Sequence, residues 1–225
     1  MDILTVQKNM VEIEHFLCVT SVINIGTNPL SYTSTRSIFN HEQRFQQTCK
    51  TLQTLKEKIE HSFILLVDAS PIPLTETQIQ MLKNVGATDV YCFRHEDCEG
   101  PYKGLGEVRI LQASLEYMTK NNIDAKWWWK IGGRAWLTEI FDVSRWLGEK
   151  PLAKFPFPQI MSTICFNVPT KQLEEFKDLL QLSVKLLKQN QGVEKVFGHL
   201  DFFDDMKGMI GVNCYCAVDG NYIAN

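Results

Sequence analysis

The sequence of 225 residues has no excess of positive charge. Its 23 lysines and arginines are outnumbered by 26 aspartates and glutamates, which leaves a net charge of −3 at pH 7. Proteins that bind DNA or RNA through the phosphate backbone need a basic surface, because the phosphates supply much of the binding energy. Nucleic acid is therefore not expected as a partner.

Paired cysteine motifs and long apolar runs are also missing. The seven cysteines include no C-x-x-C pair, so neither a disulfide framework nor a zinc ribbon is predicted. No apolar run approaches the roughly 18 residues that span a bilayer. Residues 1–15 carry acids where a signal peptide would begin with positive charge. We expect a cytoplasmic protein with no transmembrane segment.

Two common phosphate-binding fingerprints are absent as well. The stretch 100–106 contains three glycines, but it matches neither G-x-G-x-x-G nor G-x-x-x-x-G-K-[ST]. We interpret it as a loop that opens a helix over about 107–119. The N–H groups at that helix start could bind an anion together with Lys103, and a simple turn is the alternative. No H-x-x-x-H motif or carboxylate cluster suggests a zinc site.

The residues that are present predict an α/β fold. Runs of β-branched and apolar residues predict buried strands, and apolar spacings of three, four and seven predict amphipathic helices. The expected strands are 16–25, 62–67, 89–93 and 126–131, and the expected helices are 41–59, 75–85 and 107–119. Beyond residue 140 the pattern is mixed, with a short helix through 144–147, a strand at 160–168, a helix at 171–189, a polar segment through 203 and a strand near 212–218. A predominantly parallel central sheet flanked by helices is the predicted architecture.

Ligands of such sheets bind beyond the carboxyl ends of the strands. The sequence Lys130-Ile-Gly-Gly-Arg134 places two cations around two glycines at one strand end, where they could neutralise a diphosphate. A structural salt bridge in a tight turn is the alternative. Asp68 follows another strand and could hold a base or ribose, or it could open an Asx-turn before Pro71. Residues 127–129, three tryptophans, are interpreted as core packing, with a sugar-binding platform as the alternative.

Several segments taken together resemble a known family. They are Thr20-Ser-Val-Ile23, Tyr32, Arg36-Ser37, Glu42-x-Arg44, Gln47-Thr48, Asp68-x-Ser70, Lys103-Gly-x-Gly-Glu107 and Lys130-Ile-Gly-Gly-Arg134-x-Trp136-Leu137. The combination resembles GT-A type glycosyltransferase-like proteins of bacteria and large DNA viruses, in which K-[IL]-[SG]-G-R stands in place of D-x-D. The resemblance covers roughly residues 16–140.

The resemblance implies one GT-A-like domain over residues 1–225. About 1–140 would bind a nucleotide sugar, and about 141–225 would form a mixed acceptor-binding half. In GT-A enzymes the D-x-D aspartates bind a divalent metal on the donor diphosphate, and here Lys130 and Arg134 stand at that place. Cations can offset the charge on a departing nucleoside diphosphate, so no cofactor and no divalent metal are expected.

The resemblance also implies the reaction, which is transfer of a hexosyl or deoxyhexosyl group from a nucleotide-sugar donor to a glycan or small hydroxyl acceptor. The residues expected to bind the donor are Thr20, Ser21, Arg36, Asp68, Ser70, Lys103, Lys130, Gly133 and Arg134. A general base is expected within 199–205, with Asp201 preferred over Asp204 and His199. Ordinary exposed acids at a helix start are the alternative there.

Two other functions stay open from the sequence. The related group usually has Ser and Tyr where this chain has Gly132 and Ala135, which could mark a catalytically silent nucleotide- or glycan-binding module. A nucleotidyltransferase shares the α/β arrangement but needs metal-binding carboxylates near the phosphates. The early strands lack such acidic pairs, which disfavours the nucleotidyltransferase.

Overall fold

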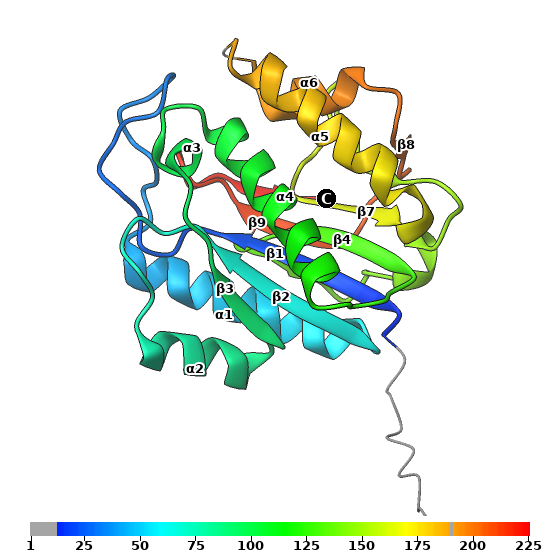
Figure 1. Cartoon of the computed structure of the whole chain (residues 1–225), viewed down its shortest axis with the longest axis horizontal. Coiled ribbons are helices and arrows are strands. Elements are labelled where there is room, and N and C mark those ends of the chain that lie inside the picture. Colours follow the sequence, from blue (N-terminus) through cyan, green and yellow to red (C-terminus); the bar gives the residue numbers. More distant parts are fainter. Residues whose placement is uncertain (1–12, 190) are drawn as a thin grey trace, which may run out of the picture.

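Strands and helices alternate through the first part of the chain. The computed structural model describes residues 13–189 and 191–225. Four parallel strands lie side by side in the order β3-β2-β1-β4, with bounds β1 (His15–Ser21), β2 (Ser62–Asp68), β3 (Asp89–Cys92) and β4 (Trp127–Gly132). The helices between them are α1 (His41–Lys58), α2 (Glu76–Val85), α3 (Glu96–Glu99) and α4 (Lys103–Lys120) (Figure 1). The predicted parallel sheet is confirmed.

The later part of the chain completes this sheet and adds a second one. Strand β7 (Cys165–Pro169) pairs antiparallel with β4, and β6 (Leu152–Ala153) and β8 (Asp204–Asp205) extend the sheet to seven strands. A separate antiparallel sheet consists of β5 (Ala135–Leu137), β9 (Val212–Tyr215) and β10 (Tyr222–Ala224). The remaining helices are α5 (Leu173–Leu187), α6 (Val193–His199) and two 3-10 turns, η1 (Val143–Trp146) and η2 (Thr170–Gln172).

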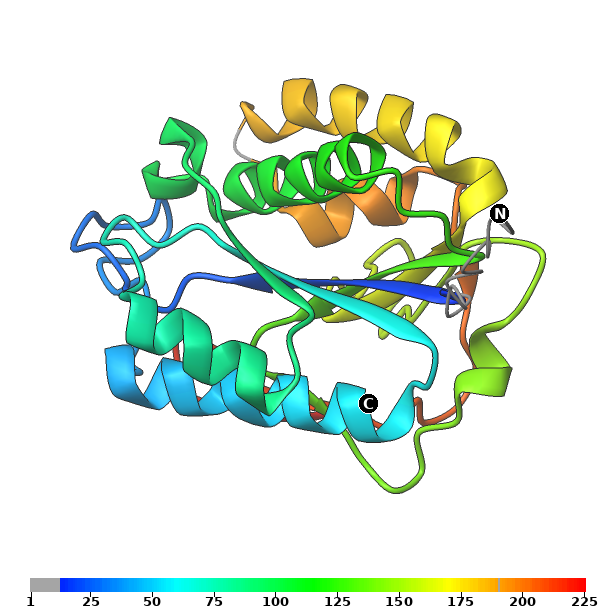
Figure 2. The ribbon, with the colours of Figure 1, turned by 60° about the horizontal axis from the view of Figure 1, so that its bottom comes forward.

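Helices cover both faces of the large sheet. Figure 2 shows α1 and α2 on one face and α4, α5 and α6 on the other. Successive strand residues point to opposite faces, so Phe16 packs in the core under α4 while Leu17 packs in the core over α1. Trp128 likewise packs in the core on the α4 side and Trp129 in the core on the α1 side, and both are fully buried. Their predicted role in the core is confirmed.

Helix α4 begins four residues earlier than predicted. It starts at Lys103, so Gly104 and Gly106 lie in its first turn rather than in a loop. Gly106 allows α3 to approach closely, because a Cβ on it would lie 2.9 Å from the Cα of Cys98. Glycine here serves a helix contact and not a turn, which local sequence does not distinguish.

Other differences concern short elements. The predicted strand 160–168 begins only at Cys165, and the polar segment before residue 203 contains α6. The final predicted strand ends at Tyr215 and is followed by β10. These elements have too few residues for a period to show in the sequence. Within the described ranges, no helix has both the length and the apolar composition needed to cross a membrane.

Candidate functional site

A cavity of about 500 Å³ opens at the carboxyl ends of β1 and β4. The two strands are paired in parallel, with Thr20 opposite Gly132, so their ends meet at one edge of the sheet. The first turn of α4, the segment 160–164 and the residues from Cys214 to Ala217 form the other walls. The volume lies within the roughly 300 to 1,000 Å³ that is usual for small-molecule sites.

The two strand ends are tied together by backbone hydrogen bonds. The Gly133 N–H donates to the Thr20 carbonyl at 2.8 Å, and the Thr48 hydroxyl on α1 donates to the Gly133 carbonyl at 3.0 Å. A Cβ on Gly133 would lie 2.8 Å from the Thr20 oxygen, so only glycine allows this approach. The floor of the cavity therefore brings Thr20, Ser21 and Gly133 together, as predicted for neighbouring strand ends.

Positive side chains outnumber negative ones in the cavity wall. Among the described lining residues, five are cations and two are carboxylates, a formal excess of three positive charges: Arg36, Arg44, Lys103, Lys130 and Arg134 against Glu107 and Glu194. The whole chain carries −3. This concentration of positive charge favours an anionic ligand.

Two of the five cations have no hydrogen bond or ion pair at any terminal nitrogen, within the residues that the structure describes. Arg134 donates only through Nε, to the Tyr215 carbonyl at 3.4 Å, and within the part of the chain that the structure describes its terminal nitrogens have no bonded partner. Lys103 is the first residue of α4, and over the same residues no ion pair or hydrogen bond engages its ammonium. The N-cap residue, Tyr102, gives α4 no side-chain cap. Arg134 and Lys103 are thus available to a ligand.

Arg44 is the buried cation that sequence reasoning did not select. Its side chain on α1 is 6% exposed and donates to the Val22 carbonyl at 2.6 Å and to the Ser37 hydroxyl at 3.2 Å. Burial, together with the charge of Arg134, lowers the pKa of Arg44 to about 9. An anion in the cavity would stabilise the charged form of the guanidinium groups of both Arg44 and Arg134. The sequence signal for Arg44 is Glu42-x-Arg44, one of the segments that carry the family resemblance.

Lys130 forms a buried ion pair instead of facing the cavity unpaired. Its Nζ lies 2.6 Å from Oε1 of Glu107, with side-chain exposures of 4% and 14%, and it also donates to the Thr163 carbonyl. The salt-bridge alternative therefore applies to Lys130 but not to Arg134. Burial raises the pKa of Glu107, but Lys130, Lys103 and Arg134 outweigh this effect and hold it below its usual value. Glu107 was not predicted, although it lies one helical turn after Lys103.

Arg36 lines the cavity but is occupied by backbone groups. Its guanidinium donates to the carbonyls of Asn28, Cys98, Glu99 and Gly100. These bonds tie the loop after β1 to α3. Arg36 therefore stabilises the cavity wall through these hydrogen bonds.

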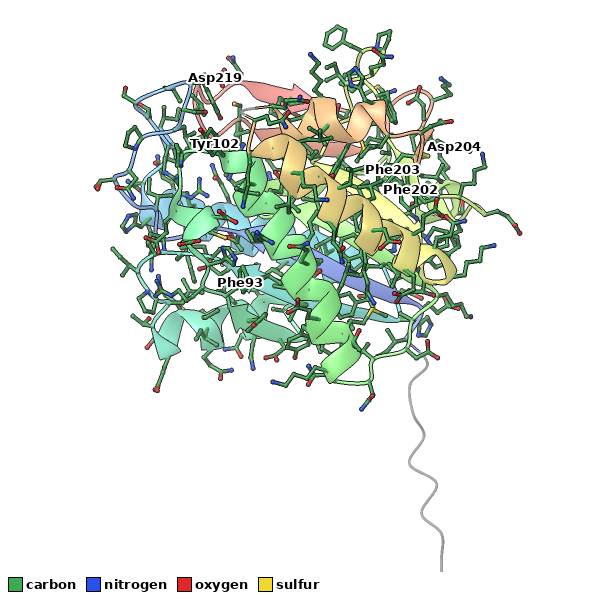
Figure 3. The ribbon with its side chains drawn as sticks, turned by 45° about the horizontal axis from the view of Figure 1, so that its top comes forward. Phe93, Tyr102, Phe202, Phe203, Asp204 and Asp219 are labelled. Carbon is green, nitrogen blue, oxygen red and sulfur yellow. The ribbon has the colours of Figure 1, made fainter. Side chains whose placement is uncertain are left out.

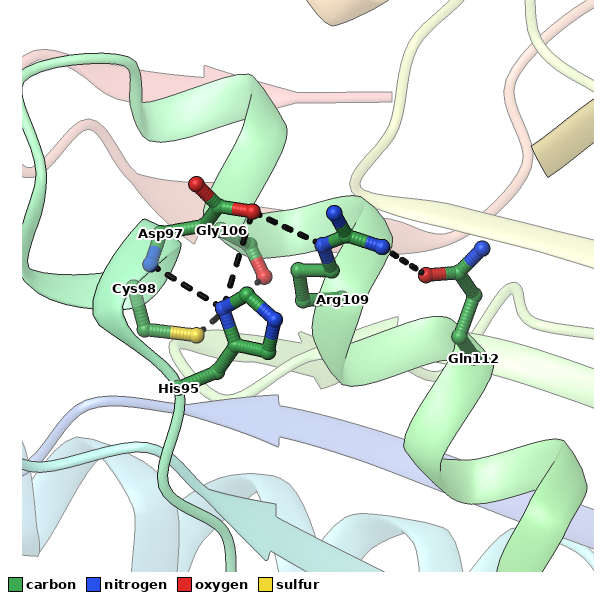
Figure 4. Close-up of polar contacts among 6 residues, drawn as sticks. All are labelled: His95, Asp97, Cys98, Gly106, Arg109 and Gln112. Carbon is green, nitrogen blue, oxygen red and sulfur yellow. Dashed lines mark hydrogen bonds and ion pairs between the residues drawn. The ribbon is translucent and has the colours of Figure 1, made fainter. Parts of the chain in front are cut away.

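A second polar network holds α3 against α4, and Figure 4 shows it. Arg109 on α4 donates through Nε to Asp97 at 2.8 Å, and the Asp97 N–H donates to Nδ1 of His95 at 3.1 Å. The Cys98 thiol lies 3.6 Å from the Gly106 carbonyl. Both Cys98 and Gly106 line the cavity, so this network positions one of its walls.

Asp68 and Ser70 lie outside the cavity lining. Asp68 is 2% exposed and accepts from the Ile23 N–H at 3.0 Å and from the Ser70 N–H at 3.1 Å. The Ser70 hydroxyl accepts from the Asn24 N–H at 2.8 Å. The bond from Ser70 is the Asx-turn that was the alternative for Asp68. Both side chains hold the backbone that follows β1.

The acids predicted to supply the base also lie outside the cavity lining. Asp204 is exposed on β8, with Lys150 3.5 Å away, and Figure 3 shows it far from Tyr102, the residue before α4. Asp201 is exposed in the turn before β8, and Nδ1 of His199 lies 2.7 Å from the Lys195 carbonyl. The structure does not bring these three side chains together with the cations. A base at this position stays a prediction.

The site does not resemble a divalent metal centre. Within residues 13–189 and 191–225, no three side chains of His, Cys, Asp or Glu gather closely enough to hold a metal ion. Arg134 stands where the resemblance would place an aspartate, and the nearby Glu107 is paired with Lys130. Lys130, Lys103 and Arg134 surround this carboxylate with positive charge, which repels a further cation. The described residues of the cavity do not fit a divalent metal.

A smaller cavity of about 110 Å³ adjoins the main one. It lies between the loop after β1, the start of α4 and the start of α6. Lys103, Glu107 and Glu194 line both cavities. The other lining residues are Ser31, Tyr32, Tyr102, Gly104, Gln191, Gly192 and Val193.

Comparison with known proteins shows a similarity of fold. No protein family and no curated protein sequence matches this chain. Two crystal structures of the glycosyltransferase GlyE from Streptococcus pneumoniae TIGR4 align with this chain. The first has a TM-score of 0.51 at 10% identity over 87% of this chain, and the second, the apo form, has a TM-score of 0.50 at 11% identity over 86% of this chain. Each alignment covers 45% of the GlyE chain. Mouse xyloside xylosyltransferase 1 aligns with a TM-score of 0.42 at 9% identity, over 87% of this chain and 85% of that enzyme.

This chain therefore spans less than half the length of GlyE. At about 10% identity the similarity shows the fold, which is the GT-A fold. The seven-stranded, mostly parallel sheet flanked by helices agrees with the predicted fold class.

Proposed function

We propose that this protein transfers a sugar, of hexosyl or deoxyhexosyl type, from a nucleotide-sugar donor to the hydroxyl group of a glycan or small acceptor. The observation that carries the proposal is the cavity at the strand ends of a GT-A fold, with its excess of three positive charges. A nucleoside diphosphate is an anion of suitable size for about 500 Å³. GlyE is described as a glycosyltransferase, which agrees with this function.

The donor diphosphate would bind the cations that have free donors. Arg134 offers a planar pair of N–H groups that suits phosphate oxygens, and Lys103 offers a point charge. Arg44 adds a buried positive charge close by. When the bond to the sugar breaks, the negative charge that develops on the diphosphate would be stabilised by these preorganised groups.

The nucleobase and the ribose of the donor would lie over the carboxyl ends of the strands. Thr20 and Ser21 line that part of the cavity and offer hydroxyl groups. Asp68 and Ser70 would support the donor indirectly, because they hold the backbone of residues 23 and 24 through hydrogen bonds. Lys130 would act through Glu107, to which it is paired.

We further propose that donor binding needs no divalent metal, because positively charged side chains line the proposed diphosphate site. The test is isothermal titration calorimetry with UDP, GDP, CDP and ADP in excess EDTA. At least one nucleoside diphosphate should bind, and its affinity should not rise on adding Mn²⁺. Affinity that appears only with Mn²⁺ would show that acidic ligands bind the metal and that the assignment of Arg134 is wrong.

An activity measurement separates a transferase from a silent binding module of the same fold. The substrates to test are the nucleotide sugars of whichever nucleoside diphosphate binds, for example UDP-glucose and UDP-galactose if UDP binds. They should be hydrolysed slowly to nucleoside diphosphate and free sugar, with water as acceptor. Binding without any turnover over this donor set would favour the silent module. Release of pyrophosphate from a nucleoside triphosphate and a sugar phosphate would indicate a nucleotidyltransferase instead.

A further inference from the structure

We infer that the small cavity binds the acceptor sugar and that Glu107 removes the proton from its reacting hydroxyl group. The inference rests on the proposed function and names the acceptor site and the base, which that function leaves open. Its starting point is that Glu107 lines both cavities. A group in that position reaches a donor on one side and an acceptor on the other.

The lining of the small cavity suits one sugar ring. Its volume of about 110 Å³ is about a fifth of the main cavity, too small for a nucleotide. Tyr32 and Tyr102 offer aromatic rings that can cover the apolar C–H face of a pyranose, and each also offers a hydroxyl. Ser31 and Gln191 add polar groups for sugar hydroxyls. The absence of apolar aliphatic side chains other than Val193 from the described lining disfavours a lipid.

Glu107 is held in the form that a base requires. Its pKa lies below the usual value because Lys130, Lys103 and Arg134 together outweigh the effect of burial. The carboxylate is therefore ionised at neutral pH. Lys130, itself fixed by the Thr163 carbonyl, holds the glutamate in place. Glu194 also lines both cavities, but no ion pair among the described residues fixes the position of its side chain.

The reaction step follows from this placement. The acceptor O–H bond breaks, and its proton passes to a carboxylate oxygen of Glu107. The acceptor oxygen bonds to the anomeric carbon while the bond from that carbon to the diphosphate oxygen breaks. The electron pair leaves with the nucleoside diphosphate, whose charge Lys103 and Arg134 stabilise. A single displacement of this kind inverts the anomeric configuration.

The base is tested with Glu107→Gln, which keeps the size of the side chain. The variant should hydrolyse the nucleotide sugar at least ~100-fold more slowly than the wild type, while calorimetry shows nucleoside diphosphate affinity near the wild-type value. Glu116→Gln is the control, because Glu116 is an exposed glutamate on the same helix. It should leave the rate unchanged.

The acceptor site is tested separately with Tyr32→Ala, which avoids the buried ion pair. Tyr32 is 64% exposed, so the variant should fold normally. With methyl glycosides of glucose, galactose and mannose as acceptors, the KM for the acceptor that reacts should rise about five-fold, with the donor KM unchanged. Tyr222→Ala is the control, since Tyr222 is an exposed tyrosine that lines neither cavity.

The outcomes distinguish this inference from the proposed function. If the wild type binds and turns over a donor but Glu107→Gln keeps a normal rate, the inference fails and the proposed function stands. Loss of turnover in Asp201→Asn or Asp204→Asn, with Glu107→Gln active, would place the base in 199–205 instead. A product with retained anomeric configuration would also overturn the step. If no donor binds to the wild type, the proposed function fails first.

Discussion

At the scale of single residues, the cations of the cavity differ in what they already bind. Arg36 donates to four backbone carbonyls, and Lys130 is paired with Glu107. Arg134 and Lys103 keep free donors in the described structure. A charged group that is already bonded contributes less to binding, because it must exchange one partner for another. Binding energy for a diphosphate should therefore concentrate on Arg134 and Lys103.

We predict that Arg134→Ala weakens nucleoside diphosphate binding by about 1.5 to 3 kcal/mol, the range for a lost hydrogen bond to a charged group. Affinity for the corresponding nucleoside should barely change, since the nucleoside lacks the phosphates. Calorimetry measures both. Arg145→Ala is the matched control, because Arg145 is an exposed arginine that binds backbone carbonyls away from the cavity. Early unfolding of Arg134→Ala in denaturant, with normal diphosphate affinity, would make Arg134 a structural residue.

At the scale of elements, the site depends on how α3 and α4 pack. The first two turns of α4 carry Lys103 and Glu107 into the wall, and the Asp97–Arg109 ion pair at 2.8 Å holds α3 against this helix. Gly106 allows the contact, because a Cβ there would lie 2.9 Å from the Cα of Cys98 and 3.0 Å from the Asp97 carbonyl oxygen. Backbone atoms cannot move aside as a flexible side chain can.

We predict that Gly106→Ala separates the two helices and lowers the free energy of unfolding by about 1 to 3 kcal/mol, the range for overpacking. Nucleoside diphosphate affinity should fall with it, because Lys103 moves with the helix start. Gly148→Ala is the control, since its Cβ would meet the nearest atom at an ordinary 3.5 Å. Denaturant unfolding and calorimetry report the two effects. Unchanged stability would mean that α3 shifts at no cost.

At the scale of the whole molecule, charge is distributed unevenly. The chain carries −3, while the cavity side chains carry an excess of three positive charges. The side chains outside the cavity are therefore negative on balance. An anionic donor is attracted to the cavity and repelled elsewhere, and such fields act on association rates more than on bound-state contacts.

We predict that the association rate constant of the nucleoside diphosphate falls several-fold between about 10 mM and about 150 mM salt. Over that range the screening length shortens from about 30 Å to about 8 Å, so attraction from a distance is lost. The rate constant of the uncharged nucleoside should stay nearly constant. Stopped-flow fluorescence measures both. An equal response of the two ligands would rule out steering by the cavity charge.

The sequence by itself determined the large sheet and the residues at its strand ends. Buried strands have an unbroken apolar pattern and helices a period near 3.6, and both are local properties of the chain. Parallel strands then require that Thr20, Ser21 and Gly133 meet at one edge, which the structure shows. Arg134 was predicted to face the same edge because it lies three residues after the predicted strand 126–131, and it does line the cavity.

Only the tertiary structure decided which other side chains join them. Glu107 and Arg44 come from helices whose faces are set by packing, and the wall at 214–217 comes from the end of β9 and the two residues after it. Packing also buries Asp68, whose carboxylate accepts hydrogen bonds from backbone N–H groups. It leaves Asp204 on an exposed strand away from the cavity. A hydropathy pattern reports whether a residue is buried, but not against which distant segment. Contacts between elements far apart in the chain carry that information, and here they placed Glu107, paired with Lys130, in the lining of both cavities.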